Sequence, residues 1–152
     1  YVPEEFDRKA FTFCFSRNPY DRAISLYAYF RTHFGQPVTF AQFFKRVYEE
    51  GVRPIGLFNS QGLSSCNPQK RWVEKLDLDF CGSFEHLEED FNRVLSHLNF
   101  SQIPLQHLNK SARKRMHQYY DLDTKKRVED FYREDFEYFG YSFEDDDIIR
   151  QN

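Results

Sequence analysis

The stretch from residue 11 to residue 25 constrains the fold most, because it predicts a buried strand that leads directly into a helix. Its first five residues, FTFCF, are apolar and aromatic, which is typical of a short strand inside a sheet. Asn18 suits the N-cap of a helix and Pro19 suits its first position. We therefore expect a strand over 11–15 and a helix from Pro19 to about His33.

This strand–turn–helix unit has the features of an anion site. Arg17 would leave the strand at the carboxyl edge of the sheet, where open α/β sheets bind ligands. The helix that follows would direct its first amide groups and its dipole into the same space. A guanidinium can grip a phosphate through two hydrogen bonds, and Ser25, two turns further on, could add a hydroxyl. Arg22 could share that face of the helix.

A purely structural reading of the same residues is open at this point. An arginine just before a helix often pairs with a carboxylate, and Ser25 could be a small packing residue. Glu85, at the expected end of a second strand, could act as a base, but a salt bridge to Arg17 or Arg22 is the commoner outcome for such a carboxylate.

Four further segments show clear periodicity. Thr39 is the expected cap of a helix that Gly51 ends, and Leu78 to Phe84 resembles a second strand. A helix with Glu88, Glu89 and Asp90 in its first turn follows, which suits the helix dipole. The apolar positions of this third helix are Leu87, Phe91, Val94, Leu95 and Leu98. One last helix is expected from about Asp123 to Phe139, stopped by Gly140, and residues 52–68 are expected to form a long loop.

The alternation of strands and helices predicts an α/β fold with a parallel sheet flanked by helices. No linker or repeat interrupts the chain, so we expect residues 1–152 to form a single domain. Only two strands are clear, and two strands make a poor sheet. We therefore expect this domain to be incomplete at its N-terminus, with strands missing upstream of Tyr1.

Composition argues against several classes of function. The 21 basic and 24 acidic residues give a net charge of −3, which disfavours non-specific nucleic-acid binding. No apolar run is long enough to span a membrane. The five histidines lack metal-binding spacing, so no metal site is expected. Three cysteines fit a reducing compartment, with one disulfide and one free thiol as the alternative.

Four motifs, in order, carry a resemblance to a known family. FSRNPYDRAISLY at residues 15–27 closely resembles the 3′-phosphate-binding motif of carbohydrate sulfotransferases. NPQ at 67–69 followed by Trp72, with DFCGSFEHLEEDF at 79–91, is similar to the second strand and helix of that family. HLNKS at 107–111 and the closing aromatic helix ending in FGYSF at 139–143 complete the likeness. It covers residues 11–143 and implies a P-loop-like sulfotransferase fold.

The resemblance implies that Arg17 and Ser25 hold the 3′-phosphate of the sulfate donor PAPS. Lys110 and Ser111 would contact its phosphates from a second loop, with PAP as the product. The acceptor would be a hydroxyl of a carbohydrate or glycan. The family's Lys-Ser or Lys-Thr loop for the 5′-phosphosulfate is not found in the sequence, and no catalytic residue is assigned.

Two rival functions stay open at this stage, a non-catalytic PAP-binding remnant and an interaction domain. The compartment is open too: bacterial members would be cytoplasmic, and animal members work in the Golgi lumen.

Overall fold

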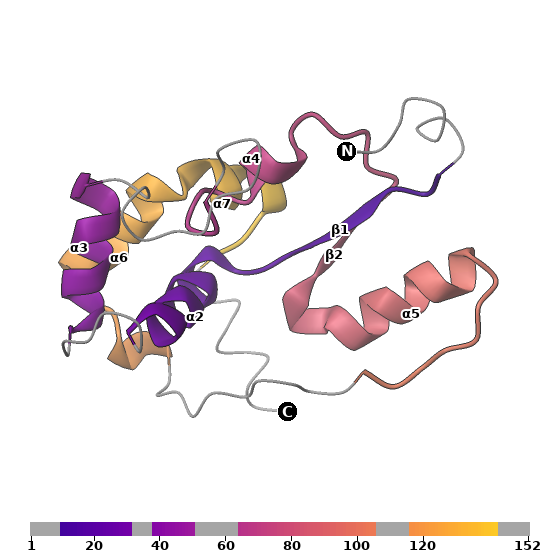
Figure 1. Ribbon diagram of the computed structural model, residues 1–152, viewed down its shortest axis with the longest axis horizontal. Coiled ribbons are helices and arrows are strands. Elements are labelled where there is room, and N and C mark those ends of the chain that lie inside the picture. Colours follow the sequence, from indigo (N-terminus) through magenta and orange to yellow (C-terminus); the bar gives the residue numbers. More distant parts are fainter. Residues whose placement is uncertain (1–9, 32–37, 51–63, 106–115, 143–152) are drawn as a thin grey trace.

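The computed structural model of the chain describes residues 10–31, 38–50, 64–105 and 116–142 (Figure 1). Within these residues, two strands form a parallel sheet. They are β1 (Phe13–Ser16) and β2 (Phe80–Ser83), paired in register with Cys14 opposite Cys81. Both expected strands are therefore confirmed, each shorter than the apolar run that predicted it. The expected α/β class with a parallel sheet and flanking helices is confirmed as well.

One face of this sheet packs against α5 (Leu87–His97), which follows β2 after a short 3₁₀ turn at Phe84–His86. The ring of Phe15 lies 6.4 Å from that of Phe91 on α5. Gly82 on β2 permits this approach, because a Cβ there would lie 2.6 Å from the Phe15 ring. Side chains alternate along a strand, so Cys14 and Ser16 face the other side of the sheet.

Local sequence chemistry explains how the first helices begin. α2 (Pro19–Phe30) starts at the expected cap, where the Asn18 side chain accepts a hydrogen bond from the amide of Tyr20. α3 (Phe40–Glu50) starts with a reciprocal pair, in which Thr39 Oγ1 accepts from the Gln42 amide and Gln42 Oε1 accepts from the Thr39 amide. Both helices follow the prediction from sequence.

The helix expected over 123–139 is wrong in one respect, because the structure divides it. α6 (Leu122–Phe131) and α7 (Arg133–Phe139) meet at Tyr132, whose φ and ψ of −103° and 21° break the helix. The break lets two adjacent rings, Phe131 and Tyr132, both pack on Phe44 of α3, each about 6.0 Å away. Gly140 ends α7 in the left-handed conformation, as expected.

The main core lies among α2, α3 and α6, which gather beyond the carboxyl end of β1, whereas α5 lies beside the strands (Figure 1). A one-turn helix, α4 (Lys70–Val73), packs against α7. The side chains of the core are largely aromatic, as the composition suggested. The buried members are Tyr20, Ala23, Ile24, Phe30, Phe40, Phe43, Phe44, Val47, Cys66, Met116, Val128 and Tyr132. No helix among the described ranges has both the length and the apolar character to cross a membrane.

Candidate functional site

Arg17 lies where the sequence predicts it, at the carboxyl end of β1 and directly before α2. Its Nε donates to Oδ2 of Asp21 at 2.6 Å, and its Nη2 contacts the same oxygen. The guanidinium carbon lies 4.4 Å from the centre of the Phe84 ring. Asp21 is nearly enclosed, whereas the Arg17 side chain is 17% exposed. The ion pair with a carboxylate, which was the structural alternative, is therefore present.

This ion pair leaves part of the guanidinium uncommitted. Both contacts to Asp21 use one edge of the fork, through Nε and Nη2. Nη1 of Arg17 donates no hydrogen bond to any of the residues that the structure describes. Ser25 lies four residues beyond Asp21, so these two residues are on the same face of α2, and Arg17 contacts that face from the turn before the helix through Asp21. An anion that meets Nη1 and Ser25 would therefore lie beside the carboxylate of Asp21.

Arg22 does not share this face. Its Nη2 donates to the carbonyl oxygens of Ser65 and Asn67, at 2.5 and 2.8 Å. Its guanidinium also lies over the ring of Tyr132, 5.4 Å from the centre. Arg22 thus ties α2 to the segment before α4 and has a structural role.

The amide end of α2 is partly occupied by groups of the protein itself. Glu85 Oε1 accepts a hydrogen bond from the amide of Asn18 at 2.7 Å, and the Asn18 side chain takes the amide of Tyr20. Glu85 therefore caps the positive end of the helix, and its expected salt bridge to Arg17 or Arg22 is wrong. A second anion at this end would depend mainly on side chains, because these two amides already have partners.

Gln69 fixes the backbone of Arg17 from across the fold. Its side-chain amide accepts from the Arg17 N–H at 3.0 Å and donates to the Arg17 carbonyl at 2.8 Å. Asp135, which is fully buried, holds Gln69 in turn, because its carboxylate accepts from the amides of Gln69 and Lys70, both at 2.8 Å. Burial raises the pKa of Asp135, and these two amides oppose the rise. We call Gln69 and Asp135 the Arg17 clamp.

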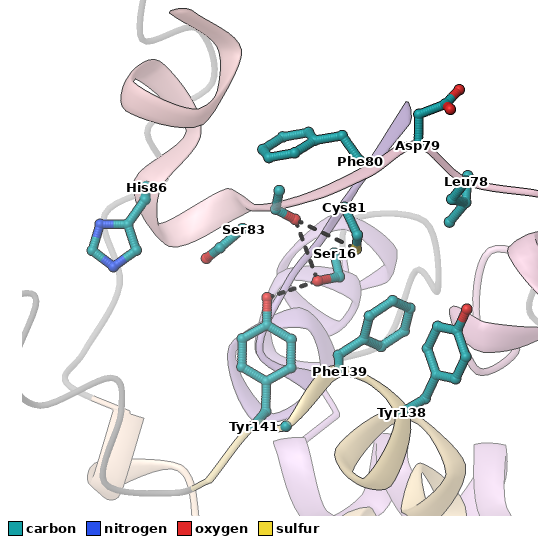
Figure 2. A pocket seen from close by; sticks show the side chains of 12 residues that line it. Ser16, Leu78, Asp79, Phe80, Cys81, Ser83, His86, Tyr138, Phe139 and Tyr141 are labelled. Carbon is teal, nitrogen blue, oxygen red and sulfur yellow. Dashed lines mark hydrogen bonds between the residues drawn. The ribbon is translucent and has the colours of Figure 1, made fainter. Parts of the chain in front are cut away.

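A cavity of about 780 Å³ lies on the face of the sheet opposite α5, between β2 and the end of α7. Figure 2 shows Ser16 and Cys81 on the strands facing Phe139 and Tyr141. The hydroxyl groups of Ser16 and Tyr141 are 2.9 Å apart, and Tyr141 also contacts Glu85 at 3.1 Å. Ser16, the last residue of β1, lines this cavity, whereas the next residue, Arg17, does not.

Tyr141 links this cavity to the start of α2. Its pKa is raised, first by burial and then by the nearby Glu85 carboxylate, so its phenol keeps its proton and donates to Glu85. The Ser83 hydroxyl donates to the same carboxylate at 2.6 Å. Glu85 therefore gathers three donors, from Asn18, Ser83 and Tyr141, at the carboxyl edge of the sheet.

Two of the predicted site residues, Lys110 and Ser111, lie outside the described residues. The structure shows Arg17 in contact with Asp21, one turn before Ser25 on α2, and the roles of Ser25 and of the second loop stay predictions from sequence. Among the described residues, no group of three or more histidine, cysteine or acidic side chains could hold a metal ion.

Sequence reasoning missed the contribution of Gln69, Asp135 and Tyr141. Gln69 stands in one of the motifs that carried the resemblance, which was a signal, but nothing local indicated its contact with Arg17. Asp135 follows the unforeseen break at Tyr132, and Tyr141 follows Gly140 in a segment that the pattern assigned only to the end of a helix.

Comparison with known proteins identifies the family of the chain. The family model described as "Sulfotransferase family" matches residues 3–142 of the 152-residue chain. No curated protein and no solved structure matches the chain. The family match includes the whole β1–α2 unit, the Gln69 segment, β2 with the 3₁₀ turn that carries Glu85, and α7. The chain belongs to the sulfotransferase family.

Proposed function

We propose that this protein transfers a sulfuryl group from PAPS to a hydroxyl of a carbohydrate, and that Arg17 and Ser25 hold the 3′-phosphate of the donor. Membership of the sulfotransferase family supports sulfuryl transfer in general. The observation that carries the finer proposal is the position of Arg17, at the carboxyl end of β1 and directly before α2, paired with Asp21 one turn before Ser25 on that helix.

The residues at this edge fit a terminal phosphate. The free edge of the Arg17 guanidinium offers Nη1 to a phosphate oxygen, and charge-assisted hydrogen bonds of this kind are short and strong. The Phe84 ring stacks against the guanidinium and fixes its plane. The Arg17 clamp fixes the backbone that carries this side chain, so little freedom is lost when a ligand binds.

Asp21 makes the site selective in one respect. Its carboxylate occupies one edge of the guanidinium, so a bound phosphate would share Arg17 with a nearby negative charge. A ligand with no further contacts would gain little from such a site. We infer that a nucleotide, which makes additional contacts through its base and sugar, is favoured over free inorganic phosphate.

In the reaction, PAPS would supply the activated sulfuryl group. The part of this chain is to anchor the nucleotide by its 3′-phosphate, so that the sulfuryl group is held in one position relative to the acceptor. Such positioning can contribute a large share of a rate enhancement. Lys110 and Ser111 are proposed as further contacts to the donor phosphates, on the basis of the resemblance alone.

The test of the donor site is calorimetric titration of the protein with PAP, comparing Arg17→Gln with Arg93→Gln. Removal of a charge-assisted contact costs about 1.5–3 kcal/mol, so Arg17→Gln should raise the Kd roughly 10- to 150-fold. Arg93 is an exposed arginine of α5 that also bridges acidic neighbours at i−3 and i−4, so its substitution controls for loss of a surface charge. We expect Arg93→Gln to leave the Kd unchanged.

Ser25→Ala should weaken PAP binding by a smaller factor, about 2- to 12-fold, because a neutral hydrogen bond contributes about 0.5–1.5 kcal/mol. Absence of heat with PAP in folded wild-type protein would refute the donor site. Equal loss in Arg17→Gln and Arg93→Gln would show that only general charge matters. The acceptor class is tested separately, by the transfer of labelled sulfate from PAPS to polysaccharides compared with tyrosine-containing peptides and simple alcohols.

A further inference from the structure

Two of the three cysteines meet across the sheet. Cys14 of β1 and Cys81 of β2 are direct partners in the parallel register, and their sulfur atoms are 3.5 Å apart. Both thiols are free, on the face of the sheet opposite α5. Figure 2 shows the Cys81 side chain on the wall of the cavity, on the same side of the sheet as Ser16. None of the functional roles described above uses this pair.

We propose that Cys14 and Cys81 form an oxidisable dithiol, which peroxide converts into a disulfide that links β1 to β2. Neighbouring strands lie roughly 4.7–4.9 Å apart, which falls inside the range of Cα separations that disulfides adopt. The sulfur atoms must approach by only about 1.5 Å to reach bonding distance, a shift that side-chain rotation can supply. The register already places the two side chains on the same face.

The two thiols differ in a way that assigns them distinct roles. Cys81 is exposed to solvent, whereas Cys14 is half-buried. Burial, together with the neighbouring Cys81, raises the pKa of Cys14 to about 12. Cys14 therefore keeps its proton at neutral pH. Because only a thiolate reacts readily with peroxide, Cys14 is not the thiol that reacts first. Oxidation begins at Cys81, and Cys14 resolves it.

The atoms and electrons balance over two steps with hydrogen peroxide as the oxidant. The Cys81 thiolate attacks one peroxide oxygen, the O–O bond breaks, and the second oxygen leaves as water after it takes up a proton. Cys14 sulfur then attacks the sulfenic sulfur of Cys81, the S–S bond forms, and the S–O bond breaks. The hydroxyl group leaves as water with the proton of Cys14. Two thiols lose two electrons, and one peroxide becomes two waters.

The third cysteine provides an internal control. Cys66 is fully buried in the core among α2, α3 and α6, away from the two strands, and burial raises its pKa as well. It should stay reduced under conditions that oxidise Cys81. If peroxide unfolded the protein, Cys66 would become exposed and would be oxidised too. Whether Cys66 is reduced or oxidised therefore distinguishes specific oxidation of the folded protein from denaturation.

The experiment treats the native protein with hydrogen peroxide, alkylates the remaining thiols under denaturing conditions, and maps the peptides by mass spectrometry. We expect a linked peptide that contains Cys14 and Cys81, with the loss of two hydrogens, in a monomeric chain whose Cys66 is alkylated. A dithiol reductant should restore all three thiols. Cys14→Ser should leave Cys81 as a sulfenic acid that reacts with dimedone.

Cys81→Ser provides a second variant at an exposed position, and it should leave Cys14 reduced at the same peroxide dose. Three results in the wild-type protein would overturn the proposal. They are a sulfinic acid at Cys81 with Cys14 still alkylatable, a disulfide between the Cys81 residues of two chains, and a link from either cysteine to Cys66.

Discussion

Replacing Gln69 with leucine should release the backbone of Arg17. The two hydrogen bonds from the Gln69 side chain, at 3.0 and 2.8 Å, satisfy both the N–H and the carbonyl of Arg17. Leucine has a similar volume and cannot form either bond. A long bond from Gln69 Nε2 to Asp135 Oδ2, at 3.4 Å, is lost as well. The backbone bonds from the amides of Gln69 and Lys70 to Asp135 stay, so the change removes only the contacts of the Gln69 side chain.

The structure allows an estimate of the loss. Each hydrogen bond contributes about 0.5–1.5 kcal/mol, and a backbone group left without a partner costs more when water cannot reach it. Gln69 is half-buried, so water can replace part of what is lost. We therefore expect the free energy of unfolding to fall by about 2–3 kcal/mol. For a chain of this length, the Tm should fall by about 4–10 °C.

The assay is urea and thermal unfolding, followed by the fluorescence of Trp72, the single tryptophan, which lies in α4 beside Gln69. Gln102→Leu is the matched control, because Gln102 is exposed in the loop after α5. If Gln69→Leu destabilises the protein no more than Gln102→Leu does, the clamp contributes nothing to stability. In that case, the bonds from Gln69 do not hold the backbone of Arg17 in place.

Two further predictions concern the sheet and α6. Gly82→Ala should lower the free energy of unfolding by about 1–3 kcal/mol, measured by urea unfolding, because the new Cβ would lie 2.6 Å from the ring of Phe15; unchanged stability would contradict this. Asp121→Ala should cost about 1 kcal/mol at neutral pH, since Asp121 caps α6 by accepting from the Thr124 amide at 2.7 Å. This bond lowers the pKa of Asp121, so its contribution is present above the unfolded value of 3.8 and is lost as the pH falls through the lower folded value. Wild type and Asp121→Ala should therefore converge in stability in strong acid, and a constant difference would refute the cap.

The parts of the fold that sequence could predict are those set by near neighbours. Asn18 and Thr39 cap their helices through bonds to residues two or three positions away, and such chemistry is visible in the sequence. The left-handed turn at Gly140 is of the same kind. These signals were sufficient to locate the β1–α2 unit and α3.

The parts that sequence could not predict depend on contacts between distant residues. Glu85 and the Asn18 amide are 67 positions apart, and Gln69 and Arg17 are 52 apart. Sequence chemistry showed that Glu85 and Arg17 needed partners, but an opposite charge was the default choice for each. For Arg17 that choice was correct, because it pairs with Asp21 four positions away, but only the three-dimensional fold shows that Glu85 accepts from a helix amide and that Gln69 holds the Arg17 backbone. The break at Tyr132 likewise accompanies a contact between distant residues, since it allows the Tyr132 ring to pack on Phe44.

The Arg17 clamp joins three stretches of chain that a protein engineer would treat as separate modules. Arg17, Gln69 and Asp135 come from the first strand–helix turn, from the start of α4 and from α7, respectively. A chimera that takes one of these stretches from a relative would introduce a side chain that does not match its hydrogen-bonding partners in the other two stretches. The position of Arg17 in such hybrids should therefore be preserved only when all three stretches are exchanged together.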